Sequence, residues 1–169
     1  KFEPKQEHEI KFRVSIIEQH KESKNLLNSS IIFAGTHEHA RKFCSKVLDK
    51  LNIEKYRTYF EQGTQTRKDL RIALKELNDG ELQCLVAVGM LSEGIDISSL
   101  RTVVLGSSNA DIRGTIQRVG RALRTDSNNP QKRAAVIDFS LGDSDSISDK
   151  ERIAFLTELN HVKNNLKAN

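Results

Sequence analysis

The sequence predicts an α/β domain in which a mainly parallel sheet is flanked by helices. Short apolar runs alternate along the chain with segments of helical periodicity, and polar residues do not interrupt the runs. Such runs are typical of parallel strands that helices cover on both faces. A chain of 169 residues with 37% hydrophobic content fills one core of this kind, so we expect a single domain.

Five runs are predicted to be strands, and two helices are predicted between them. The first helix is expected over Glu38–Leu51. Thr66, with Asp69 three residues later, approximates a capping box that opens the second, which ends near Asp79. A further capping box at residues 148–151 opens a final helix, and sparse apolar positions indicate a surface helix over residues 9–27. The predicted strands are Ser30–Ala34, Tyr56–Phe60, Gln83–Val88, Thr102–Leu105 and Ala134–Phe139.

Several classes of protein are not expected. The chain begins at Lys1 without a signal peptide pattern, and no apolar run reaches the roughly 20 residues of a membrane span. Cys44 and Cys84 have no partner at metal-ligand spacing, so we expect buried reduced thiols and no metal site. We interpret the chain as a fragment of a longer cytoplasmic protein without membrane contact.

The charge balance favours an anionic partner. The formal net charge is +4 and the pI is about 9.1. Nucleic acid is one such partner, although a solvated lysine-rich surface explains the same surplus.

The segment QRVGRALR, residues 117–124, is the strongest motif. On a helix, Gln117, Arg121 and Arg124 share one face, and apolar residues occupy the opposite face. Two guanidinium groups on one face suit an anion such as a triphosphate. A solvated basic helix is the alternative interpretation.

This segment resembles motif VI of superfamily 2 helicases, in its Q-x-x-G-R-x-x-R form. In the same order along the chain, IIFAGT at 31–36 is similar to motif IV, and VGMLSEGIDI at 88–97 resembles motif V. FEQG at 60–63 is similar to the segment between them. The resemblance covers roughly residues 30–139. It implies the second motor domain of such a helicase, a RecA-like three-layer sandwich.

The resemblance implies three parts of the chain. Residues 1–29 would be a leading helix and linker from an N-terminal motor domain. Residues 30–140 would be the C-terminal RecA-like domain, and residues 141–169 a connector and final helix.

The resemblance also implies roles in ATP binding and hydrolysis. Arg121 and Arg124 correspond to arginine fingers that stabilise charge on the transferred phosphoryl group. Gln117 corresponds to a sensor near the γ-phosphate. Gly94 and Asp96 correspond to positions that face the nucleotide, with the carboxylate accepting a hydrogen bond from ribose. A cap on the following turn is the alternative for Asp96.

Four further residues would lie along the nucleic-acid strand by the same resemblance. These are Thr36, Gly63, Gly89 and Met90. Backbone amides and small hydroxyls suit this role, because they bind phosphates without reading the base sequence. The chain has Val88-Gly89 where many relatives have Thr-Asp, so the Gly89 and Met90 amides would provide the grip. An N-cap of the following helix is the alternative role of Thr36.

The chain contains no G-x-x-x-x-G-K-[ST] loop and no acidic D-E-x-H quartet. ATP and Mg²⁺ would therefore bind mainly to the N-terminal RecA-like domain of the same polypeptide, and this chain alone should not hydrolyse ATP. The expected function is that of an ATP-dependent helicase or translocase. DNA is favoured over RNA, because motif VI begins with Gln117 and not with His.

Two alternatives remain. One is a non-catalytic nucleic-acid-binding or scaffold domain that retains the helicase fold, against which the intact Arg121 and Arg124 argue. The other is an unrelated α/β nucleotide-binding enzyme, which the lack of a Gly-rich phosphate loop disfavours.

Overall fold

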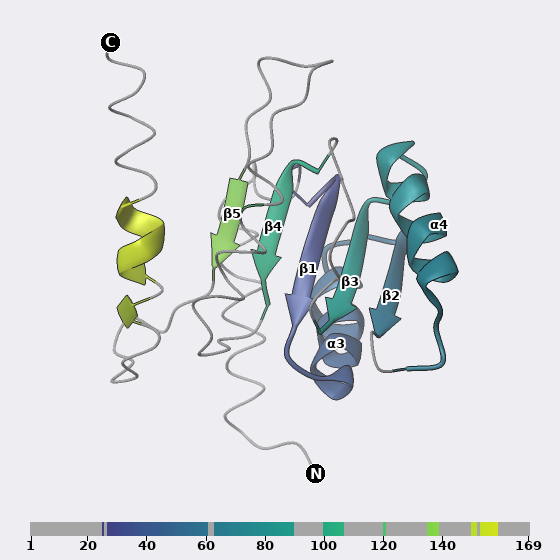
Figure 1. Cartoon of the computed structure of the whole chain (residues 1–169), viewed down its shortest axis with the longest axis horizontal. Helices are drawn as coiled ribbons and strands as arrows, with labels where there is room; N and C mark the ends of the chain where they lie inside the picture. Colours follow the sequence, from purple (N-terminus) through teal and green to yellow (C-terminus); the bar gives the residue numbers. More distant parts are fainter. Residues whose placement is uncertain are drawn as a thin grey trace.

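The computed structural model is organised around one parallel sheet. It describes residues 25, 27–60, 63–89, 100–106, 120, 135–138, 150–151 and 153–158. The strands pair in the order β2-β3-β1-β4-β5, and every pairing is parallel, so all the arrows of Figure 1 point the same way. The strands are β1 (Ser30–Ala34), β2 (Tyr56–Phe60), β3 (Cys84–Val88), β4 (Thr102–Leu105) and β5 (Ala135–Asp138).

Strand β1 lies at the centre of the sheet and is buried along its whole length. Successive side chains of a strand point to opposite faces. Ile31 and Phe33 pack into the hydrophobic cluster on one face, and Ile32 and Ala34 pack into the cluster on the other. Both faces are apolar because both are covered, which explains why the run in the sequence is uninterrupted.

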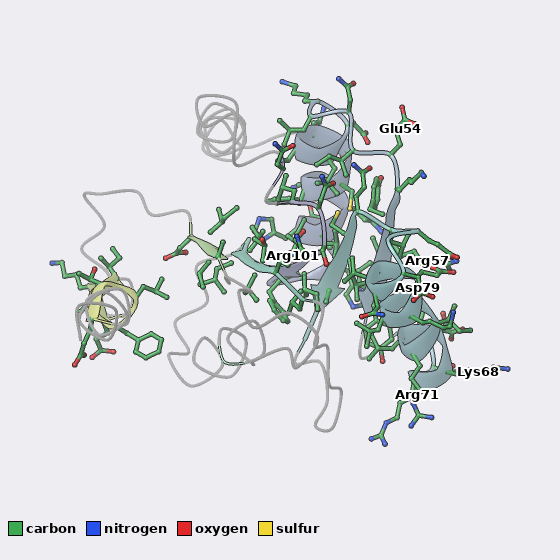
Figure 2. The ribbon with its side chains drawn as sticks, turned by 90° about the horizontal axis from the view of Figure 1, so that it is seen from above. Glu54, Arg57, Lys68, Arg71, Asp79 and Arg101 are labelled. Carbon is green, nitrogen blue, oxygen red and sulfur yellow. The ribbon has the colours of Figure 1, made fainter. Side chains whose placement is uncertain are left out.

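The two faces are covered by different helices. Helices α3 (His37–Phe43) and α4 (Arg67–Asn78) lie on opposite sides of the sheet (Figure 2). Leu70, Leu74 and Leu77 of α4 recur at helical spacing and are buried in one cluster. Ala40 and Phe43 of α3 are buried in the other. These layers and the parallel sheet confirm the predicted fold class.

The predicted helix over Glu38–Leu51 is shorter and less regular than expected. Helix α3 ends at Phe43 and continues as one π-helical turn, η1 (Cys44–Leu48). The Asp49 N–H donates to Cys44 O at 3.1 Å, five residues back. The wider turn buries Cys44, Val47 and Leu48 together, which a 3.6-residue period does not indicate.

The capping box predicted for α4 is confirmed. Thr66 Oγ1 accepts a hydrogen bond from Asp69 N, and the Asp69 carboxylate accepts one from Thr66 N. The Thr66 hydroxyl also donates to Asp69 Oδ2 at 2.8 Å. The bonds that the carboxylate accepts, first from the Thr66 backbone and then from its hydroxyl, hold the pKa of Asp69 below its ordinary value. The helix ends at Asn78, close to the predicted stop.

The remaining predicted elements are described in part. Residues 150–151 and 153–158 are helical, which agrees with the predicted final helix, and residue 25 is helical within the predicted leading segment. Residues 148 and 149 of the final capping box lie outside the described residues. No helix within the described residues is long and apolar enough to cross a membrane.

Cys44 and Cys84 are free and buried, as the sequence predicted. Burial raises the pKa of Cys44 from 9.0 to about 11, with a further contribution from Asp49. Burial likewise raises the pKa of Cys84 from 9.0 to about 12, with Cys44 as the second cause. Tyr56 lies against Cys44, and burial raises its pKa as well.

Replacing Thr66 with Ala should destabilise the domain by about 1 kcal/mol, because it leaves N–H groups at the start of α4 without an acceptor. Urea unfolding followed by circular dichroism measures this change. Thr66→Ser keeps the hydroxyl and should stay within a few tenths of a kcal/mol of the parent. Equal losses in the two variants would contradict the capping role.

The free energy of unfolding should decrease as the pH rises above about 9. In the unfolded chain both thiols lose their protons near 9.0, whereas the folded chain keeps them to about 11 and 12. Since the folded state then binds more protons, stability is complete below pH 9 and is lost as the pH rises through the folded values. Urea unfolding from pH 8 to 10.5 measures this slope.

The control is a Cys44→Ala, Cys84→Ala double variant. It should show a shallower pH slope, whatever its stability at pH 8. An unchanged slope would assign the pH dependence to other groups.

Candidate nucleic-acid interface

Three neighbouring strands end at the same edge of the sheet. Ala34 of β1 and Phe60 of β2 are both in register with Val88 of β3. The loops after β2, β3 and β1 therefore emerge side by side, at the lower edge in Figure 1. In open α/β sheets, ligands bind outside the carboxyl ends of the strands. We refer to this place as the carboxyl edge.

The structure brings three of the residues that are predicted to contact nucleic acid to the carboxyl edge. Thr36 follows β1, Gly63 follows β2 and Gly89 follows β3. Gly89 has a φ of 95°, a conformation that favours glycine over every residue with a side chain. Met90 lies outside the described residues. The contact of these residues with nucleic acid stays a prediction.

Gly63 stands in a tight turn against β2. Its N–H donates to Phe60 O at 2.9 Å. A Cβ at position 63 would lie 3.1 Å from Phe60 Cβ and 3.2 Å from Phe60 O, closer than most side-chain contacts. Glycine therefore allows the chain to turn closely at the end of β2.

Thr36 is the N-cap of α3. Its Oγ1 accepts a hydrogen bond from His39 N at 3.1 Å, and its carbonyl accepts one from Ala40 N at 2.9 Å. This confirms the capping alternative. The residue is exposed, and a hydroxyl also has a proton to donate, so capping leaves it able to bond to a phosphate oxygen.

The backbone of Gly106 approaches β1 closely, which the sequence did not lead us to expect. The Gly106 N–H, directly after β4, donates to Phe33 O at 2.8 Å. A Cβ at this position would lie 2.9 Å from the same oxygen. The glycine that directly follows the apolar run of β4 is the sequence signal for such an approach.

An aromatic contact at the carboxyl edge was also missed. The rings of His37 and Phe60 are stacked, with centroids 4.3 Å apart and planes at 28°. The two residues are 23 positions apart, and no sequence pattern pairs them.

Three exposed cations, Arg67, Lys68 and Arg71, occupy the first two turns of α4, next to the loop of Gly63. Lys68 and Arg71 point away from the sheet (Figure 2). The ion pairs among the described residues use other cations, namely Lys42–Glu38 at 2.6 Å, Arg57–Glu76 at 2.6 Å and Lys75–Asp79 at 2.7 Å. A local surplus of positive charge therefore flanks the carboxyl edge on the α4 side.

The predicted nucleotide-contacting residues lie outside the described residues. Between 107 and 134 the structure describes Gly120 alone, which is helical and exposed. A Cβ there would meet nothing within 4 Å. The predicted residues are Gly94, Asp96, Gln117, Arg121 and Arg124.

Comparison with known proteins gives one family. The model described as "Helicase conserved C-terminal domain" matches residues 11–126. The ATP-dependent helicase Lhr-Core protein 2 of Thermococcus barophilus is 33% identical over 109 residues, which cover 63% of this chain and 12% of that protein. The chain thus spans only a small part of this curated relative.

Solved structures give the same architecture. S. cerevisiae Dbp5 bound to RNA and ADP BeF3 has a TM-score of 0.59 at 20% identity, covering 89% of this chain and 35% of that one. The helicase domain of Pyrococcus furiosus Hef has a TM-score of 0.54 at 25% identity, covering 79% and 26%. The likeness to Dbp5 supports the fold alone.

The family match covers most of the chain, and the parallel sheet agrees with it. The chain belongs to the helicase conserved C-terminal domain family, which is the second RecA-like domain of superfamily 2 helicases.

Proposed function

We propose that this domain forms part of a nucleic-acid track through the loops that follow β2, β3 and β1. The supporting observation is the shared position of Thr36, Gly63 and Gly89 at the carboxyl edge. Glycines let a strand approach backbone N–H groups, and a threonine adds a hydroxyl. Such groups bind phosphates of any sequence, which suits a protein that moves along a strand.

The charge distribution supports the same proposal. Arg67, Lys68 and Arg71 add cations beside Gly63, and the strand is a polyanion. Phosphate neutralisation of this kind is long-ranged and independent of sequence, and it depends strongly on salt. The three cations would attract the strand, and the loops would hold it.

A second part of the proposal concerns hydrolysis. Arg121 and Arg124 act as arginine fingers, Gln117 acts as a γ-phosphate sensor, and Gly94 and Asp96 contact the nucleotide. These groups fit a nucleoside triphosphate by their chemistry, since guanidinium groups donate hydrogen bonds to phosphate oxygens and a carboxylate accepts them from ribose hydroxyls.

The domain needs a partner for this activity. The chain has no phosphate-binding G-x-x-x-x-G-K-[ST] loop, so ATP with Mg²⁺ would bind between it and an N-terminal RecA-like domain of the same polypeptide. Bound ATP supplies the phosphoryl group whose hydrolysis drives movement. The domain alone would be inactive.

The whole protein would be a cytoplasmic helicase or translocase that prefers DNA to RNA. The preference is proposed because motif VI begins with Gln117, unlike the His that usually begins this motif in DEAD-box proteins. Competition between DNA and RNA strands of one sequence tests it, and tighter binding of RNA would reverse it. A scaffold domain that has lost catalysis is the alternative function, and the arginine variants separate the two.

Arg121→Ala and Arg124→Ala in the full-length protein should each lower nucleic-acid-stimulated ATP turnover by about 100-fold or more. Each variant lacks one guanidinium group that stabilises negative charge on the transferred phosphoryl group. Steady-state ATPase assays measure the change, and thermal melts confirm that the variants are folded. Near-normal turnover in folded variants would favour the scaffold function.

Thr36→Asp should weaken strand binding by about fivefold to tenfold at low salt, because a carboxylate near phosphates repels them. Thr36→Asn is the matched control. Asp and Asn cap helices equally well, so both variants should keep the stability of α3, and only their charge differs. Fluorescence anisotropy with a labelled oligonucleotide measures binding, and equal affinities of the two variants would remove Thr36 from the track.

A further inference from the structure

The stacked rings of His37 and Phe60 lie across the carboxyl edge. Phe60 ends β2 and His37 follows Thr36 at the start of α3, while β3 runs between β2 and β1 in the sheet. The stack therefore spans the end of β3, directly before Gly89. His37 is exposed and Phe60 is half-buried. The imidazole ring of His37 therefore rests on the Phe60 ring in the middle of the proposed track.

The backbone of Phe60 is fixed on both sides. The Phe60 N–H donates to Gln65 Oε1 at 2.8 Å, and the Phe60 carbonyl accepts a hydrogen bond from Gly63 N at 2.9 Å. Gln65 is fixed in turn, because its Nε2 donates to Thr58 O at 2.8 Å. The ring itself packs against the hydrophobic cluster beneath α3.

His37 is positioned from the other side. It directly follows the N-cap Thr36, whose hydroxyl fixes the first turn of α3. A side chain at this position that rests on Phe60 has lost much of its rotational freedom before any ligand arrives. Ordering a side chain in advance lowers the entropic cost of binding.

An exposed ring of this kind has an obvious chemical partner in a nucleic acid. Histidine is among the side chains on which unpaired bases stack, and such stacking tolerates any sequence because every base has a π-face. Backbone amides and hydroxyls, by contrast, contact phosphates. The carboxyl edge presents both kinds of group within a few residues of each other.

We propose that the His37–Phe60 pair is a stacking platform for one base of the bound strand, with His37 touching the base and Phe60 supporting the imidazole. The inference rests on the proposed nucleic-acid track. It adds a contact to a base, where the track itself needs only phosphates. Phe60 is a positioning residue, because it acts through His37.

The test uses the full-length protein and a series of single-stranded oligonucleotides. Each carries one abasic site, moved by one nucleotide along the series, so that the phosphates are unchanged. For the parent protein, one position should weaken binding by about fivefold or more when its base is removed. Fluorescence anisotropy measures the affinities.

The His37→Ala variant should bind the intact oligonucleotide as weakly as the parent binds the sensitive abasic one. It should lose no further affinity when that base is removed. His37→Phe keeps a stacking ring and should retain the sensitivity. His39→Ala is the matched control, since it changes another histidine of the same turn, and it should behave like the parent.

A second readout follows the base itself. With 2-aminopurine at the sensitive position, the parent and His37→Phe should quench its fluorescence on binding, and His37→Ala should not. Phe60→Leu keeps an apolar side chain in the cluster but removes the aromatic support, and it should reduce the quenching. Thermal melts establish that each variant is folded.

The outcomes separate this proposal from the one on which it rests. Tight binding without a sensitive position, or equal sensitivity in the parent and in His37→Ala, would overturn the stacking platform and leave the track in place. Equal binding of the nucleic acid by Thr36→Asp and Thr36→Asn would remove Thr36 from the track, and the platform at its neighbour His37 would be overturned with it.

Discussion

The parallel pairing of β1 with β3 and β4 is the constraint on which the rest of the structure depends. Every residue of β1 is buried, and the strand pairs with β3 over all five residues and with β4 over the first four. Parallel strands bring all their carboxyl ends to one edge. The loops there can differ in sequence without affecting the buried pairing, so the edge is free to carry function while the centre supplies stability.

The strand order also divides this edge into two parts. The loops after β2, β3 and β1 occupy one part and carry Thr36, Gly63 and Gly89. The segment that contains Arg121 and Arg124 leaves the sheet after β4 and returns at β5. The two parts meet where β1 pairs with β4, and both of these strands are buried.

Most of the sheet could be predicted from the sequence, because it depends on local apolar runs. β1, β2 and β4 have the predicted bounds, β3 begins one residue later than predicted, and β5 is one residue shorter than predicted at each end. The capping box of α4 was also predictable, since Thr66 and Asp69 are three residues apart. In both cases the residues that interact are close in the sequence or share one simple period.

The features that were missed depend on contacts between distant residues. In the π turn after Phe43, three side chains pack into the same cluster, and a helical period of 3.6 residues does not predict this packing. The His37–Phe60 stack joins the start of α3 to the end of β2 across the end of β3. The roles of the motif V and motif VI residues came from resemblance, and these residues lie outside the described part of the chain.

The amide of Gln65 has a consequence for the outer edge of the sheet. It accepts a hydrogen bond from the N–H of Phe60 and donates one to the carbonyl of Thr58, and among the described strands both groups lie on the side of β2 away from β3. A foreign strand that tried to extend the sheet would need these same two groups. One side chain thus occupies two of the backbone groups that an added strand would need, which disfavours aggregation by strand pairing at this five-residue edge.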